Sequence, residues 1–118
     1  MNLLHKALII DKSDFIRKIL THHLQAKNIA VKTANNGTEG LALFYKALPD
    51  CVIIDTNLSD ITGLQVIQEM KKYDSNTNII ITNDVLEKQD VTQLINLGIK
   101  KFNLKPYRID KLLESMER

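Results

Sequence analysis

Residues Pro49–Gly63, PDCVIIDTNLSDITG, decide the fold of this chain: a proline–aspartate turn is followed by four consecutive apolar residues, Cys51 to Ile54. A short apolar run bounded by turn signals predicts a strand buried on both faces, as in a parallel sheet. The run ends on a lone carboxylate, Asp55. Because ligands of open α/β sheets bind just beyond the carboxyl ends of such strands, Asp55 is predicted to be a functional residue rather than a loop cap.

Four other short apolar segments are also predicted to be strands: Lys6–Ile10, Ile29–Ala34, Asn78–Thr82 and Lys101–Leu104. Helical patterns separate the strands, starting near Ser13 and near Thr38 and then covering about Leu64–Tyr73, Asp90–Leu97 and Arg108–Glu117. Strands that alternate with helices predict an α/β fold with a parallel sheet and right-handed crossovers. Five strands favour the doubly wound, flavodoxin-like order 2-1-3-4-5, with a switch point between the first and third strands.

Apolar residues spaced by three and four predict the helix faces that pack on this sheet. The expected buried residues are Phe15, Ile16, Ile19, Leu20 and Leu24 in the first helix, Leu41, Phe44, Tyr45 and Leu48 in the second, and Val66, Ile67 and Met70 in the third.

The composition is that of an ordinary globular protein: 118 residues, 44% hydrophobic and 25% charged, with a net charge of +2. Residues 1–118 are predicted to form a single domain. The dispersed basic residues argue against direct binding to nucleic acid or to a membrane surface. The absence of a signal-peptide pattern and of a long apolar run favours a cytoplasmic protein. The single cysteine, Cys51, is predicted to be a buried structural thiol.

Four polar residues follow strands of the predicted sheet: Asp11, Asp55, Thr82 and Lys105. Two carboxylates in close proximity need a cation between them, and Mg²⁺ binds through one or two carboxylates while it keeps waters for a phosphate group. A carboxylate beside such an ion can attack phosphorus and form an aspartyl phosphate. Thr82 could then hydrogen-bond a phosphoryl oxygen, and Lys105 could form an ion pair with one.

From Leu4 to Arg118, the chain resembles the receiver domains of bacterial two-component response regulators. The resemblance rests on the segments ALIIDKSDFIRKIL, CVIIDTNLSDITGL, IIIT and FNLKPY. It implies that Asp55 accepts phosphate from a histidine kinase or phosphotransfer protein. It also implies that Lys105, followed by Pro106, is the family's conserved lysine.

The resemblance implies further roles for residues around this aspartate. Thr82 matches the switch threonine or serine, and Phe102 matches an aromatic residue that rotates on activation. Asn57 matches the residue whose backbone carbonyl binds the metal together with Asp11 and Asp55. Asp84 matches a position that tunes the lifetime of the phosphate.

Two departures from the family pattern stand out. The family usually places a second acid after the residue matched by Asp11, but here that residue is Lys12. The ammonium of Lys12 either takes the place of the metal ion or points into solvent, and in both cases one carboxylate ligand is missing. Mg²⁺ binding is therefore predicted to be weak. Ser59 and Asp60 replace the usual proline and glycine, and they are still expected to form a turn.

The leading hypothesis is a receiver that accepts a phosphoryl group and acts by binding a downstream effector, with no enzymatic activity beyond its own phosphorylation and dephosphorylation. A homodimer is compatible with the sequence. The alternative, raised by Lys12, is a pseudo-receiver that binds proteins independently of phosphate. A flavin-binding protein is disfavoured because the loop DKSD begins with an acid. A phosphatase with an aspartate nucleophile is disfavoured because Asn57 stands where such enzymes have a second acid.

Overall fold

Strands and helices alternate along the whole computed structural model, which describes residues 5–83, 87–105 and 108–116. The strands are β1 (Lys6–Ile10), β2 (Ala30–Ala34), β3 (Cys51–Asp55), β4 (Ile79–Asn83) and β5 (Lys101–Leu104). The helices are α1 (Asp14–Gln25), α2 (Gly37–Ala47), α3 (Gly63–Tyr73), α4 (Lys88–Asn96) and α5 (Ile109–Met116). Most boundaries lie within two residues of those predicted from the sequence.

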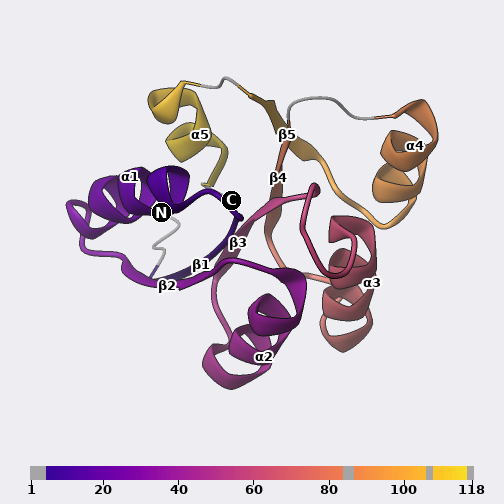
Figure 1. The fold of residues 1–118 in the computed structure, drawn as a ribbon, viewed down its shortest axis with the longest axis horizontal. Coiled ribbons are helices and arrows are strands. Elements are labelled where there is room, and N and C mark those ends of the chain that lie inside the picture. Colours follow the sequence, from indigo (N-terminus) through magenta and orange to yellow (C-terminus); the bar gives the residue numbers. More distant parts are fainter. Residues whose placement is uncertain (1–4, 84–86, 106–107, 117–118) are drawn as a thin grey trace.

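All five strands are parallel and lie in the order β2-β1-β3-β4-β5, which confirms the predicted topology (Figure 1). β3 is central, and all five of its residues are buried, as the apolar run from Cys51 to Ile54 indicates. The register sets Ile10 beside Ile54 and Asp55 beside Thr82. The carboxyl ends of β1, β3 and β4 therefore meet at one edge of the sheet.

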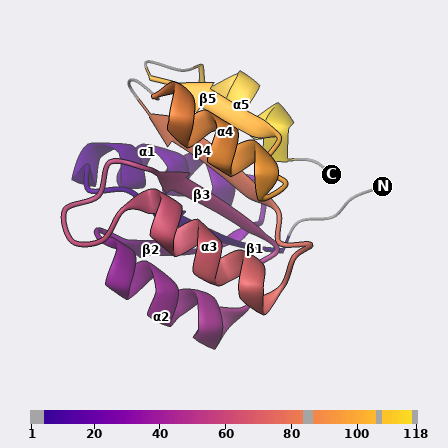
Figure 2. The same ribbon diagram turned by 90° about the vertical axis from the view of Figure 1, so that its right-hand side faces the viewer.

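Two helical layers cover the sheet: α1 and α5 lie on one face, and α2, α3 and α4 lie on the other (Figures 1 and 2). Successive side chains of a strand point to opposite faces, so each strand contributes to two cores. In β3, Val52 and Ile54 pack with the layer of α2, α3 and α4, whereas Cys51 and Ile53 pack with α1 and α5. Cys51 is buried and forms no disulfide, as predicted. No helix within the described ranges is long and apolar enough to span a bilayer.

Three of the predicted core residues are wrong, because Phe15, Tyr45 and Leu48 are largely exposed, with relative exposures of 69%, 43% and 53%. Phe15 lies in the first turn of α1, outside the part of the helix whose residues Leu20 and Leu24 are buried. Leu48 is the C-cap of α2 and leaves the helical path with φ of 49°. Tyr45 packs edge-on against neighbouring rings on the outer surface of α2 and α3, which leaves part of its ring in solvent.

Capping side chains fix the starts of α1, α2 and α3. Ser13 caps α1 by accepting a hydrogen bond from the backbone N–H of Ile16, as its place before Asp14 suggests. Asn36 caps α2, so this helix begins at Gly37, one residue earlier than predicted. Gly98 follows α4 with φ of +89°, the left-handed conformation that favours glycine after a helix C-terminus.

Gly63 permits the loop after β3 to fold back on itself. A Cβ at this position would lie 2.4 Å from the Cα of Thr56. Thr56 directly follows Asp55, so a shift of its backbone would also disturb the end of β3. Gly63→Ala is therefore expected to lower the free energy of unfolding by about 1–3 kcal/mol, the usual cost of overpacking. Urea denaturation measures this change.

The matched control is Gly40→Ala, in which the added carbon would lie 2.5 Å from Cδ1 of the Ile10 side chain. A side-chain end can move more readily than backbone, so we expect a smaller loss for this variant. Equal losses in the two variants would contradict the assignment of a backbone clash to Gly63.

Candidate functional site

The four residues predicted from the sequence meet at the carboxyl edge of the sheet. Asp11 directly follows β1, Asp55 is the last residue of β3, and Thr82 lies in β4. Lys105 follows β5, and its backbone N–H donates to the carbonyl of Asn83, with 2.6 Å between the two atoms. This bond continues the β4–β5 pairing and directs the lysine toward the centre of the sheet edge.

Lys105 bridges the two carboxylates. Its Nζ lies 2.9 Å from Oδ2 of Asp11 and 2.9 Å from Oδ2 of Asp55. Both acids are buried, with relative exposures of 2% and 4%. Burial acts to lower the pKa of Lys105, but the hydrogen bonds to Asp55 and Asp11 outweigh it and raise the pKa above its ordinary value. The lysine therefore stays charged at neutral pH and is shared by two buried anions.

The second oxygen of each carboxylate is fixed by the loop that follows it. The backbone N–H of Ser13 donates to Oδ1 of Asp11 at 2.8 Å, and that of Asn57 donates to Oδ1 of Asp55 at 2.9 Å. Both acids are thus held on one side by backbone and on the other by Lys105. The arrangement leaves little rotational freedom to either group before any ligand arrives.

The hydroxyl of Thr82 is buried beside this triad and has no hydrogen-bond partner among the described residues. Leaving a buried hydroxyl unpaired costs about 1–3 kcal/mol relative to a satisfied one. Thr82 is aligned with Asp55 in the pairing of β3 and β4. If a group attached to Asp55 carried an acceptor oxygen, the Thr82 hydroxyl would be available nearby to donate a hydrogen bond to it.

Lys12 lies on the surface rather than in the cluster. Its side chain is exposed. Within the part of the chain that the structure describes, no salt bridge joins it to Asp11 or Asp55. The geometry of Lys12 accordingly favours the solvent-facing alternative, and Lys105 supplies the charge that faces both acids.

The donor groups of this site suit Mg²⁺ poorly but not prohibitively. Mg²⁺ commonly uses one or two carboxylates, several waters and a phosphate group, and Asp11 and Asp55 provide the two carboxylates. The described residues contain no group of three or more acidic, histidine or cysteine side chains placed to hold a metal. Because Lys105 already contacts both acids and offsets one of their two negative charges, an incoming ion must compete with its ammonium. The two carboxylates are compatible with a bound Mg²⁺.

The remaining predicted residues take different positions. Asn57 is exposed and contacts Asp55 through its backbone N–H. Phe102, in β5, is partly buried and packs against the core under α4. Asp84 and Pro106 lie outside the described residues.

Asp60 has a role that the sequence did not reveal. Its carboxylate accepts hydrogen bonds from the backbone N–H groups of Gly37 and Thr38 at 2.8 and 2.9 Å, and from the Thr38 hydroxyl at 2.6 Å. The Thr38 hydroxyl and these N–H groups lower the pKa of Asp60 well below its usual range. The loop after β3 is thus tied to the N-terminus of α2, where a negative charge is favourable.

A second unpredicted contact joins the loop after β3 to the last residue of β4. The side-chain amide of Asn83 donates to the hydroxyl of Thr56. Each residue directly follows a site residue, Asp55 or Thr82, so the strand register could have pointed to this pair. Arg17 is also close to the site, since its guanidinium donates to the backbone carbonyl of Asp11 at 2.6 Å.

Comparison with known proteins places this geometry in a familiar context. The family model for the response regulator receiver domain matches residues 7–117. The chemotaxis protein CheY of Bacillus subtilis is 27% identical over 115 residues, which cover 97% of this chain and 96% of CheY. The regulatory protein AtoC of Escherichia coli is 26% identical over 112 residues, but these span 24% of its length and 95% of this chain.

Solved structures show the same fold. A high-resolution structure of the chemotaxis protein CheY4 of Vibrio cholerae has a TM-score of 0.87 and 27% identity, with 97% of each chain covered. A CheY-like receiver domain from Methanospirillum hungatei has a TM-score of 0.91 at 22% identity, over 97% of this chain and 91% of that one. The similarity thus extends over nearly the whole sheet and its helices.

Proposed function

This chain belongs to the family of response regulator receiver domains, and we propose that it receives a phosphoryl group on Asp55 and signals by binding a partner protein. The observation that carries the proposal is the position of Asp55. Its carboxylate ends the central strand, is held by Lys105 and by the N–H of Asn57, and is aligned with the unpaired hydroxyl of Thr82.

The chemistry is a transfer between two nucleophiles. An oxygen of Asp55 attacks the phosphorus of a phosphohistidine on a kinase or phosphotransfer protein, the P–N bond breaks, and the histidine leaves with the electron pair. Lys105 is placed to stabilise the negative charge of the phosphoryl oxygens. Mg²⁺, when bound by Asp11, Asp55 and the Asn57 carbonyl, would neutralise part of the same charge.

Phosphorylation would redistribute the contacts of the triad. The Thr82 hydroxyl gains an acceptor on the phosphoryl group, and Lys105 exchanges a carboxylate oxygen of Asp55 for a phosphoryl oxygen. The backbone N–H of Lys105 donates to the carbonyl of Asn83. A movement of Lys105 would therefore shift the carboxyl ends of β4 and β5. Phe102 lies in β5 and packs on the core beneath α4. A shift of β5 would therefore move Phe102 and change the surface near α4 to which a partner could bind.

One observation favours a second candidate function. The residue after Asp11 is the exposed Lys12 rather than a second acid, so one metal-binding carboxylate is missing, as expected of a pseudo-receiver that binds proteins independently of phosphate. The two candidates differ in a single measurable property, namely whether Asp55 becomes phosphorylated.

The test is incubation with acetyl phosphate, with and without Mg²⁺, followed by intact mass measurement. We expect one phosphoryl adduct on the wild-type chain, none on Asp55→Asn, and an unchanged adduct on the control Asp110→Asn, whose carboxylate is exposed in α5. An adduct that persists in Asp55→Asn would remove this residue from the role. No wild-type adduct at saturating Mg²⁺ would support the pseudo-receiver.

A further inference from the structure

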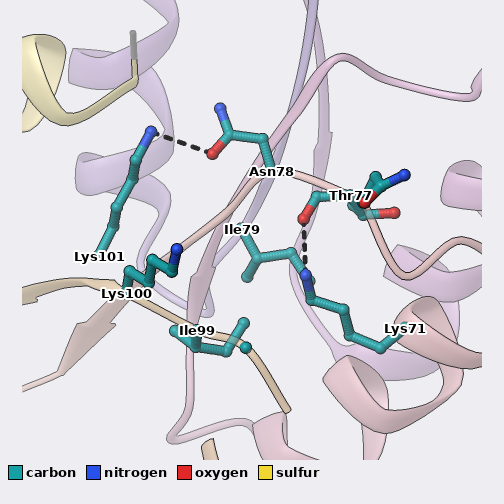
Figure 3. A pocket seen from close by; sticks show the side chains of 9 residues that line it. Lys71, Thr77, Asn78, Ile79, Ile99, Lys100 and Lys101 are labelled. Atoms are coloured by element: carbon teal, nitrogen blue, oxygen red, sulfur yellow. Dashed lines mark hydrogen bonds between the residues drawn. The ribbon is translucent and has the colours of Figure 1, made fainter. Parts of the chain in front are cut away.

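A second polar site lies at the opposite edge of the sheet from Asp55. A cleft of about 290 Å³ opens at the amino ends of β4 and β5, next to the end of α3 (Figure 3). We call it the lysine cleft after three of its residues, Lys71, Lys100 and Lys101. None of the described residues that line it is acidic. The proposed phosphorylation chemistry uses no part of this cleft.

Lys71 is held in place at one side of the cleft. It extends from α3, and its Nζ donates to the backbone carbonyl of Thr77 at 3.0 Å (Figure 3). The same Nζ donates to the backbone carbonyl of Ser75, also at 3.0 Å. Burial lowers the pKa of Lys71, and the nearby charge of Asp74 offsets part of this effect. No salt bridge joins Lys71 to Asp74 within the described ranges. A partly buried ammonium bonded to neutral carbonyls is well suited to gain an anion.

The other side of the cleft is also ordered by hydrogen bonds. Lys101 donates to Oδ1 of Asn78 at 3.2 Å, and Nδ2 of Asn78 donates to the carbonyl of Met116 in α5 at 3.1 Å. Lys100 is exposed, and its ammonium lies between Lys71 and Lys101 in the view of Figure 3. Three cations from α3, the α4–β5 connection and β5 thus border one concave surface.

We propose that the lysine cleft binds a small phosphate-bearing anion, either inorganic phosphate or a phosphate monoester. Lysine acts as a point charge that suits phosphate, whereas planar carboxylates are matched best by arginine, which is not among the residues lining the cleft. The volume is at or just below the lower limit of usual ligand cavities, so the ligand is small.

Binding there would reach the candidate phosphorylation site through β4. This strand begins at Ile79, which lines the cleft, and carries Thr82 near its other end. A ligand that fixes the start of β4 is therefore placed to influence the strand that pairs with Asp55. Any such influence would be reciprocal, so phosphorylation would change the affinity of the cleft by the same factor.

The experiment is a titration of the full chain, followed by backbone amide shifts at constant ionic strength, with inorganic phosphate and glycerol phosphate in separate arms and acetate as the comparison. We expect both phosphates to shift the amides of residues 71, 76–79 and 98–101, and acetate to bind at least tenfold more weakly. Tighter binding of glycerol phosphate would identify an ester as the ligand, and tighter binding of inorganic phosphate would identify the free ion.

The variant Lys100→Glu tests the cleft without disturbing its hydrogen-bonded walls, because Lys100 is exposed. We expect its phosphate affinity to fall at least tenfold. Lys88→Glu makes the same change of charge on the exposed start of α4 and should leave the affinity unchanged. Equal affinities in the two variants, equal binding of acetate, or shifts confined to Asp55, Thr82 and Lys105 would each overturn the proposal.

Discussion

Replacing Lys105 with methionine is expected to lower the free energy of unfolding by about 3–5 kcal/mol at pH 7, the usual cost of removing one partner from a buried ion pair. Methionine keeps much of the length of the lysine stem but removes the cation. Asp11 and Asp55, whose side chains are 3% and 5% exposed, would then lie in the same pocket as unbalanced anions. Urea denaturation at pH 7 measures the loss.

The stabilisation that Lys105 provides depends on pH, because its ammonium must stay protonated. The pKa of Lys105 is raised in the folded chain, so its stabilisation is fully present below the ordinary lysine value of about 10.4 and is lost as pH rises through the raised value. In Lys105→Met the deficit comes from two facing carboxylates.

Two variants separate charge from packing. Lys105→Met combined with Asp11→Asn leaves one buried carboxylate instead of two, and it should recover at least half of the lost stability. Lys88→Met removes an exposed lysine from α4 and should have little effect. A loss that is not recovered by Asp11→Asn would mean that the lysine stem, rather than its charge, stabilises the site.

The variant Lys12→Asp is expected to raise the affinity for Mg²⁺ by roughly 10- to 100-fold. It adds a carboxylate next to Asp11 and removes a positive charge, which changes the local charge by two units. At an effective dielectric constant near 40 and a separation of about 8 Å, each unit is worth about 1 kcal/mol. A total of about 2 kcal/mol exceeds the 1.4 kcal/mol that corresponds to a tenfold change in affinity.

Calorimetric titration of Mg²⁺ into both proteins measures this change. Lys27→Asp is the matched control, because it alters the net charge equally at an exposed position beyond the far end of α1. An increase of similar size in this control would indicate a general effect of net charge. Unchanged affinity in Lys12→Asp would mean that an aspartate at this position also faces solvent and does not complete the metal site.

The sequence predicted the sheet and the centre of the site well, because both depend on strong local signals. Continuous apolar runs such as Cys51–Ile54 mark buried strands, and their number leads to the order of the sheet. That order then brings Asp11, Asp55 and Lys105 together although they are far apart in the chain.

The features that the sequence did not predict depend on tertiary context. Helical spacing places Tyr45 on the predicted buried face of its helix, but the burial of its ring depends on how the neighbouring helix packs against it. The direction of the Lys12 side chain depends on whether a buried cation already faces Asp11, which only the position of Lys105 decides. Asp60 looked like a turn residue because its partners, Gly37 and Thr38, lie 22 or 23 positions earlier.

The bridge from one lysine to two acids also bears on the order in which the chain can fold during synthesis. Asp11 and Asp55 precede Lys105 by 94 and 50 residues, so both acids leave the ribosome before the cation that bridges them. At 5–20 residues per second, the segment from Asp55 to Lys105 takes roughly 3–10 s to synthesise. During that interval, burial of the carboxylates of Asp11 and Asp55 costs free energy, because no cation is present to pair with them. The acidic edge of the sheet is therefore expected to close only after the segment that ends at Lys105 has been synthesised.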